Sequence, residues 1–162
     1  MFKKFFQVPP GPSKSFINIK QSKFMMERKY PEPVVGALIF SRNRILLIKS
    51  HKWRNKYAIP GGHIELGEKV EEALKREIRE ETGLSVYDIE FICFQEFVFD
   101  EVFWKKRHFI FLDFACKTDS TEVKLNSEGQ EFKWVALDEA LKLDIEPYTR
   151  RTIEEYLKLH KK

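Results

Sequence analysis

The sequence has few cysteines and no long apolar run, and both shortages restrict the class of protein. Its 162 residues include two cysteines, Cys93 and Cys116. Two cysteines outside a CxxC pair are too few for a disulfide framework, so we expect buried free thiols, as in a reducing compartment. The longest apolar run, residues 34–40, is far shorter than the ~20 residues of a transmembrane helix. Pro9 and Pro10 interrupt the N-terminal region before a signal-peptide apolar stretch can form. We therefore expect a cytoplasmic protein without a membrane partner.

The composition is that of a folded domain. Hydrophobic residues make up 43% of the chain and aromatic residues 14%, with 15 phenylalanines, which argues against disorder. Charged residues make up 33%, and the formal net charge is +4. A mild positive excess suits an anionic partner such as a phosphate compound, a nucleic acid or a membrane surface, without choosing among them.

The positions of prolines and the spacing of apolar residues divide the chain into two parts. Residues 1–31 are rich in proline and basic residues and read as an N-terminal extension, followed by one domain over residues 32–162. Apolar runs predict strands over residues 34–40, 45–49, 58–59, 89–99, 108–116 and 131–135. Helices are expected over residues 67–82, 138–143 (with Asp138 as N-cap) and 147–158. This order predicts an α/β (α+β) fold, a mixed β-sheet sandwiched between α-helices.

The helix within residues 62–84, GHIELGEKVEEALKREIREETGL, does not have an ordinary apolar face. At about 100° per residue that face contains four aliphatic side chains, Val70, Ala73, Leu74 and Ile78. Glu77 and Glu81, four residues apart, fall on the same face, and Glu80 lies at its edge. Carboxylates directed into the protein must be neutralised. Basic side chains, protonation or a divalent cation would each do so, and oxygen ligands favour Mg²⁺, Mn²⁺ or Ca²⁺.

The residues around these acids can each be explained by a structural role as well as by a role at a binding site. The glycine pair at 61–62 permits a tight backbone next to a ligand. Glu68 is expected in the first helical turn, where a negative charge is favourable. Arg76 is expected away from the apolar face, paired with Glu80 or Glu72.

These residues resemble the Nudix box: a glycine, five residues, a glutamate, seven residues, then Arg-Glu-aliphatic-any-Glu-Glu-any-Gly-aliphatic. Here the pattern consists of Gly62, Glu68 and REIREETGL at 76–84, and all nine constrained positions match. So many positions at fixed spacing are a specific signal. The resemblance extends over roughly residues 34–158 and leaves residues 1–31 outside.

The resemblance implies the Nudix fold and Mg²⁺-dependent hydrolysis of a diphosphate bond, with Mn²⁺ as the alternative ion. It implies the following metal ligands: Glu77, Glu80 and Glu81, with Glu68 and the Gly62 carbonyl as additions. The general base varies within the family. Glu80, Glu81 and Glu128 are the candidates here, and the alternative for Glu128 is a solvated turn residue.

Substrate contacts are less specific. The candidates for phosphate binding are Arg44, Lys49, His51, Lys52 and Arg54, each of which is individually typical of an ordinary surface charge. Trp53 is a candidate for stacking on a base. The window 99–103, where some Nudix subfamilies carry a proline or tyrosine marker, contains neither. This disfavours ADP-ribose and dinucleoside polyphosphates.

Three functions follow from these residues. The first is hydrolysis of a small-molecule nucleotide, either a nucleoside triphosphate or a nucleoside diphosphate linked to another group. The basic termini make RNA 5′-end pyrophosphohydrolysis the enzymatic alternative. A nucleotide-sensing module without catalysis is the third, although it leaves the glutamate cluster without a purpose. The phenylalanine-rich strands also suggest a homodimer.

Overall fold

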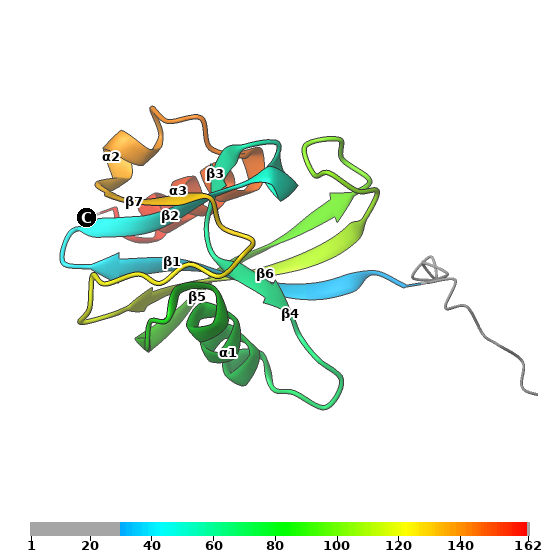
Figure 1. The fold of residues 1–162 in the computed structure, drawn as a ribbon, viewed down its shortest axis with the longest axis horizontal. Helices are drawn as coiled ribbons and strands as arrows, with labels where there is room; N and C mark the ends of the chain where they lie inside the picture. Colours follow the sequence, from blue (N-terminus) through cyan, green and yellow to red (C-terminus); the bar gives the residue numbers. More distant parts are fainter. Residues whose placement is uncertain (1–29, 162) are drawn as a thin grey trace, which may run out of the picture.

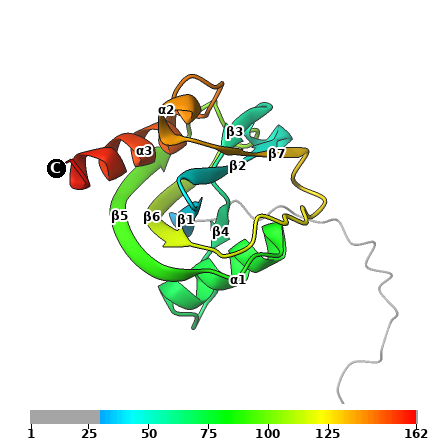
Figure 2. The same cartoon turned by 90° about the vertical axis from the view of Figure 1, so that its left-hand side faces the viewer.

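The computed structural model describes residues 30–161, so almost all of the expected N-terminal extension (residues 1–31) lies outside the described residues. The described chain forms one seven-stranded mixed sheet with helices on both faces (Figures 1 and 2). The strands are β1 Glu32–Ser41, β2 Arg44–Ser50, β3 Lys56–Ala58, β4 Gly61–His63, β5 Tyr87–Val98, β6 His108–Lys117 and β7 Glu131–Val135. The helices are the 3₁₀ turn η1 His51–Trp53, α1 Val70–Thr82, α2 Leu137–Ala140 and α3 Pro147–Leu159. The predicted α/β fold class is confirmed.

The sheet is centred on β1. Its main order is β3-β2-β1-β6-β5, while β4 also pairs with β1 and β7 with β2. β1 and β6 run parallel, from Glu32 opposite Phe109 to Phe40 opposite Lys117, and the other pairs are antiparallel. The predicted hairpin between the first two strands is confirmed by the pairing of Phe40 with Ile45. β1 therefore has β2 on one side and β6 on the other, which places it in the middle of the sheet.

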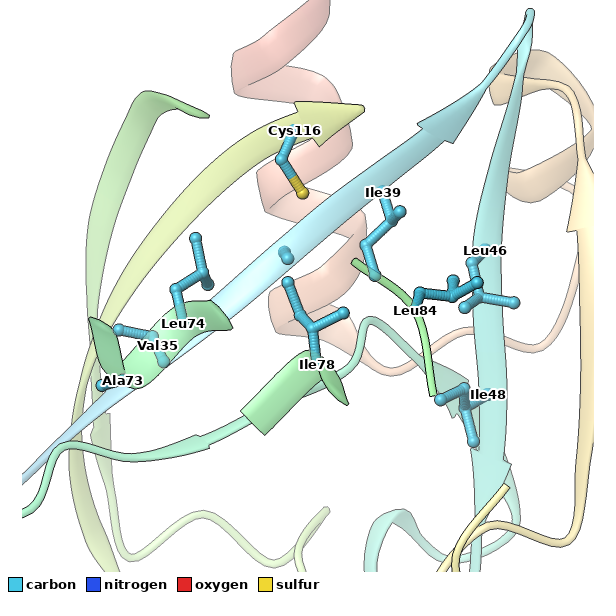
Figure 3. Packing of buried hydrophobic residues seen from close by; sticks show 10 residues of the cluster. Val35, Ile39, Leu46, Ile48, Ala73, Leu74, Ile78, Leu84 and Cys116 are labelled. Atoms are coloured by element: carbon cyan, nitrogen blue, oxygen red, sulfur yellow. The ribbon is translucent and has the colours of Figure 1, made fainter. Parts of the chain in front are cut away.

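The near-continuous apolar run in β1 is explained by burial on both of its faces. Val35, Ala37 and Ile39 pack in one cluster with side chains of α1, as Figure 3 shows for most of this cluster. Leu38 belongs to a second cluster on the opposite face, which contains residues of α2 and α3. Figure 2 shows the sheet between α1 and the pair α2 and α3. The position of α1 against the sheet is therefore fixed by a fully buried apolar stripe.

The starts of two helices differ from the sequence prediction. α1 begins at Val70 rather than at residue 67, because Gly67 adopts a positive φ of 86° that is incompatible with a helix. Glu68 consequently precedes the helix instead of lying in its first turn. The N-cap of α2 is Ala136, not Asp138, and Glu139 accepts a hydrogen bond from the Ala136 backbone N–H at 3.3 Å.

Two further expectations concern the thiols and the membrane. Both cysteines are free, but only Cys116 is buried, and Cys93 on the edge strand β5 is partly exposed. The prediction of two buried thiols is thus correct for one of them. Within residues 30–161, no helix is both long and apolar enough to span a bilayer.

Candidate active site

A cavity of about 290 Å³ lies where β4, α1, β6 and α3 meet. One group of lining residues is polar: Lys52, Gly61, Gly62, Glu77, Glu81 and Glu128. A second group is aromatic: Trp53, Phe103, Phe109, Phe111 and Tyr148. The cavity therefore combines a charged region beside α1 with a region suited to a flat apolar group.

Glu81 is the most perturbed acid of the polar group. Its Oε2 accepts a hydrogen bond from the Gly61 N–H at 2.9 Å. Burial, reinforced by the negative charges of Glu77 and Glu128, raises the pKa of Glu81 to about 8. The positive charge of Lys52 acts in the opposite direction but does not cancel this effect. None of the ion pairs found among residues 30–161 includes Glu81.

Glu77 is held against the glycine turn. Its side chain is 16% exposed, and its Oε1 accepts a hydrogen bond from Arg76 Nη1 at 2.8 Å. A Cβ atom at Gly62 would overlap the Glu77 carboxylate, so that carboxylate would have to move. Gly62 therefore lets the backbone of β4 approach the carboxylate without displacing it.

Arg76 links most of the remaining glutamates. Its guanidinium donates to both carboxylate oxygens of Glu68 at 2.8 Å and to the His63 carbonyl at 2.9 Å. This bidentate contact lowers the pKa of Glu68 to about 2 and raises that of Arg76. Glu80, whose side chain is 59% exposed, lies 3.6 Å from Arg76 Nη1. The expected pairing with Glu80 is thus present at ion-pair distance, whereas Glu72 lies near Lys69 instead.

Salt bridging therefore accounts for some of these glutamates but not for Glu81. Arg76 pairs with Glu68 and Glu77, whereas no ion pair among residues 30–161 includes Glu81, and its pKa is raised. Within residues 30–161, no three His, Cys, Asp or Glu side chains are gathered tightly enough to form a ready metal site. The oxygen donors of Glu77 and Glu81 beside Gly62 nevertheless fit a divalent cation that prefers oxygen ligands. Such an ion would compensate the charge that burial opposes on Glu81.

Glu128 reaches the same cavity from the segment between β6 and β7. Its carboxylate accepts a hydrogen bond from Lys52 Nζ, and its backbone carbonyl accepts one from Ser50 Oγ at 3.2 Å. Its own backbone N–H donates to Asn126 Oδ1 at 3.0 Å. The side chain is 47% exposed, so Glu128 borders the cavity while water can still reach it.

The structure separates the predicted substrate contacts. Trp53 and Lys52 line the cavity, whereas Arg44, Lys49, His51 and Arg54 are not among its lining residues. Lys49 lies 3.6 Å from Glu131. His51 packs edge-on against the Trp104 ring with centroids 5.6 Å apart, and the Arg54 side chain donates to the Glu101 carbonyl. Arg44 is exposed at the β1–β2 turn.

The polar residues of the cavity that sequence reasoning missed include Asp113, Glu146 and Thr149. Asp113 is a single acid within the apolar strand β6, and its exposed fraction is 2%. An acid in the middle of such a run, HFIFLDFAC, was a signal that the sequence contained. Glu146 and Thr149 gave no comparable signal, because they lie at the start of an ordinary amphipathic helix.

The family model for the NUDIX domain matches residues 30–156. The chain belongs to the Nudix family. The predicted Nudix box therefore comprises β4, the turn that follows it and α1, and the enzyme is a Nudix hydrolase of the MutT type. Members of this family generally need a divalent metal ion, in agreement with the oxygen donors of Glu77 and Glu81.

Named relatives support this assignment. The Nudix chain is 36% identical over 130 residues to the nucleoside triphosphatase NudI of Escherichia coli, and the match covers 74% of this chain and 92% of the relative. The MutT NUDIX hydrolase from Burkholderia pseudomallei has a similar structure, with a TM-score of 0.68, 27% identity, and coverage of 78% of this chain and 98% of that one. The MutT protein from Methanosarcina mazei Go1 gives a TM-score of 0.68 at 26% identity, covering 83% and 99%.

Proposed function

We propose that this Nudix enzyme hydrolyses a nucleoside triphosphate at a diphosphate bond, with Mg²⁺ as its ion. The observation that carries the proposal is the placement of Glu77, Glu81 and Gly62 together in a cavity that also has an aromatic wall. The similarity to a nucleoside triphosphatase over most of both chains supports the substrate class. The free thiols Cys93 and Cys116 suit a reducing compartment and hence a cytoplasmic enzyme.

The ion's contribution would be to neutralise the diphosphate oxygens and orient a water molecule for in-line attack. Glu77 and Glu81 would hold it, with the Gly62 carbonyl as a further oxygen donor. Glu68 and Glu80 contribute through Arg76, which fixes the carboxylate of Glu77. Arg76 is therefore a positioning residue in this proposal.

Glu128 is the proposed general base. It accepts a proton from the attacking water as the water oxygen bonds to phosphorus, and the bridging P–O bond breaks with its electron pair leaving on the departing phosphate. Lys52, which donates to Glu128 in the cavity wall, would place a positive charge beside the substrate phosphates. Glu80 and Glu81 are the alternative bases, and a Glu128→Gln variant that keeps full activity would favour them.

The test is release of phosphate or pyrophosphate from a nucleotide panel with Mg²⁺, with Mn²⁺ and with EDTA. The panel contains the eight common ribo- and deoxyribonucleoside triphosphates, ADP-ribose, nucleoside diphosphate sugars, a dinucleoside polyphosphate and 5′-triphosphorylated RNA. We expect metal-dependent turnover of at least one triphosphate, and a loss of at least 100-fold in Glu81→Gln.

Glu71→Gln is the matched control, because Glu71 lies on the exposed face of the same helix and its ion pair within residues 30–161 is with Lys75 at 2.8 Å. It should retain wild-type turnover. Turnover confined to triphosphorylated RNA would support the RNA alternative. Nucleotide binding without any turnover would support the sensing alternative, and either result would contradict the proposal.

A further inference from the structure

The aromatic group of the cavity forms a continuous wall drawn from three parts of the chain. Trp53 follows β2, Phe103 lies between β5 and β6, Phe109 and Phe111 belong to β6, and Tyr148 opens α3. Ring centroids lie 4.8 Å apart for Trp53 and Phe103, 6.3 Å for Trp53 and Phe111, and 5.4 Å for Phe111 and Tyr148. Four of these rings, all except Phe109, keep part of their surface exposed. A planar ligand would gain stacking contacts there.

Asp113 lies in the same cavity, and its strongest hydrogen bonds to the protein converge on one carboxylate oxygen. Its Oδ2 accepts hydrogen bonds from Gln95 Nε2 and Thr152 Oγ1, both at 2.7 Å. Neither bond involves Oδ1. Burial raises the pKa of Asp113 to about 6 despite those two donors. Because Asp113 lines the cavity, a ligand that supplied an N–H would meet a carboxylate acceptor there.

Gly36 keeps the space next to this oxygen free. It lies opposite Asp113 in the parallel pairing of β1 with β6. A Cβ at residue 36 would stand 2.6 Å from Asp113 Oδ1 and 3.0 Å from Ile59 Cδ1. All three residues line the cavity, so the missing side chain preserves room at the free oxygen.

Glu146, which also lines the cavity and is as little exposed as Asp113, already has its partners. Glu146 is the N-cap of α3, and its two oxygens accept hydrogen bonds from the backbone N–H groups of Tyr148 and Thr149. It therefore has a complete structural role. Asp113 differs, because Oδ2 alone anchors α3 through Thr152 while Oδ1 is not needed for that contact.

We propose that the aromatic wall binds the nucleobase of the substrate and that Asp113 Oδ1 accepts a hydrogen bond from an N–H of that base. Asp113 is then a residue that determines base specificity, and the phosphates extend toward Glu77, Glu81 and Lys52. The inference rests on the proposed function for the identity of the substrate, but the contact can be measured without any diphosphate chemistry.

The binding experiment uses free nucleosides in EDTA, with neither phosphate nor metal present. Trp53 in the wall reports binding through its fluorescence, and Trp53→Phe identifies its share of the signal. The four common ribonucleosides are compared, together with a matched pair in which uridine is methylated at N3 or at C5. The N3 methyl group removes the N–H donor, whereas the C5 methyl group leaves it intact.

We expect at least one nucleoside to bind, and we expect loss of the N–H donor to weaken nucleoside binding by at least tenfold. The same pair of methyl groups is also tested in the corresponding uridine triphosphates, where loss of the donor should lower kcat/KM by at least tenfold. Asp113→Asn should change the order of preference among the four bases. Thr82→Val is the control for a purely structural effect: Thr82 is fully buried and bonds Ile78 and Leu84 outside the cavity, so its loss should lower the melting temperature while the base order stays as in the wild type.

An unchanged base order in a folded Asp113→Asn variant would overturn the proposal. If that variant does not fold, the methylated triphosphates decide the question with the wild-type enzyme, and equal kcat/KM for the N3 and C5 forms would overturn it. Triphosphate hydrolysis without base selectivity would leave the proposed function standing and remove this inference. Selective nucleoside binding without hydrolysis of any triphosphate would do the reverse.

Discussion

Replacing Glu81 by glutamine should stabilise the metal-free enzyme while abolishing its activity. The Glu81 carboxyl is buried beside Glu77 and Glu128, and its pKa rises from 4.5 to about 8. At about 1.4 kcal/mol per tenfold change in proton affinity, this difference opposes folding by on the order of 4 kcal/mol at pH 8. Glutamine keeps an acceptor for the Gly61 N–H and carries no charge. We expect a gain of about 2 to 4 kcal/mol, the lower figure allowing for solvent that reaches the partly exposed side chain.

The sign of this effect varies with pH in a defined way. Below pH 4.5 both the folded and the unfolded chain keep the Glu81 proton, so wild type and variant should differ little. As the pH rises toward 8 the unfolded chain loses the proton first, and the wild type loses stability relative to the variant. The advantage of glutamine should therefore grow across this range.

Urea denaturation in EDTA at pH 5 and pH 8 measures the effect, with Glu71→Gln as the exposed control. Added Mg²⁺ should stabilise the wild type, by about 2.7 kcal/mol at a hundred times its dissociation constant, and should have little effect on Glu81→Gln. A variant that is no more stable than the wild type at pH 8, or whose advantage does not change with pH, would refute this account of the site.

Three other predictions follow from the geometry. Gly62→Ala should lower kcat by about 100-fold without unfolding the protein, because its Cβ would displace the Glu77 carboxylate; circular dichroism and steady-state kinetics test this together. Arg76→Lys should reduce metal affinity by about 10- to 100-fold, because lysine cannot hold Glu68 with two parallel bonds; metal titration followed by calorimetry would show it. The predicted homodimer is favoured by exposed Phe91 and Phe94 on the edge strand β5, and sedimentation that detects only a 19.4 kDa species at micromolar concentration would contradict it.

The parts of the site that were predictable share one property: they are local in sequence. The helical period alone places Glu77 and Glu81 on one face, and the structure brings both to the glycine turn. The same period places Ala73, Leu74 and Ile78 in the core, where all three are fully buried. A repeating geometry converts residue spacing directly into position, so these predictions needed no tertiary information.

The parts that were missed depend on contacts between distant segments. β4 is three residues long and contains two glycines, and only its pairing with β1 makes it a strand. Asp113 gains its importance from Gly36 opposite it and Thr152 beneath it, which lie far away in the chain. The start predicted for α1 at residue 67 was wrong for a local reason. Gly67 has a positive φ, which composition alone does not reveal.

The segment between β6 and β7 lacks regular secondary structure, yet its main chain is attached at several points. Backbone N–H groups of Lys124, Asn126 and Gln130 donate to carbonyls of Thr82, Glu81 and Lys49, respectively. The path of the segment is thus set mainly by peptide groups, which every sequence provides. Some side chains of the segment are nevertheless needed, because Val123 and Leu125 pack against the core and Asn126 accepts a hydrogen bond from the Glu128 N–H. The exposed positions Lys124, Ser127 and Gln130 are therefore the natural places to vary the segment in a mutant library while the cavity keeps its shape.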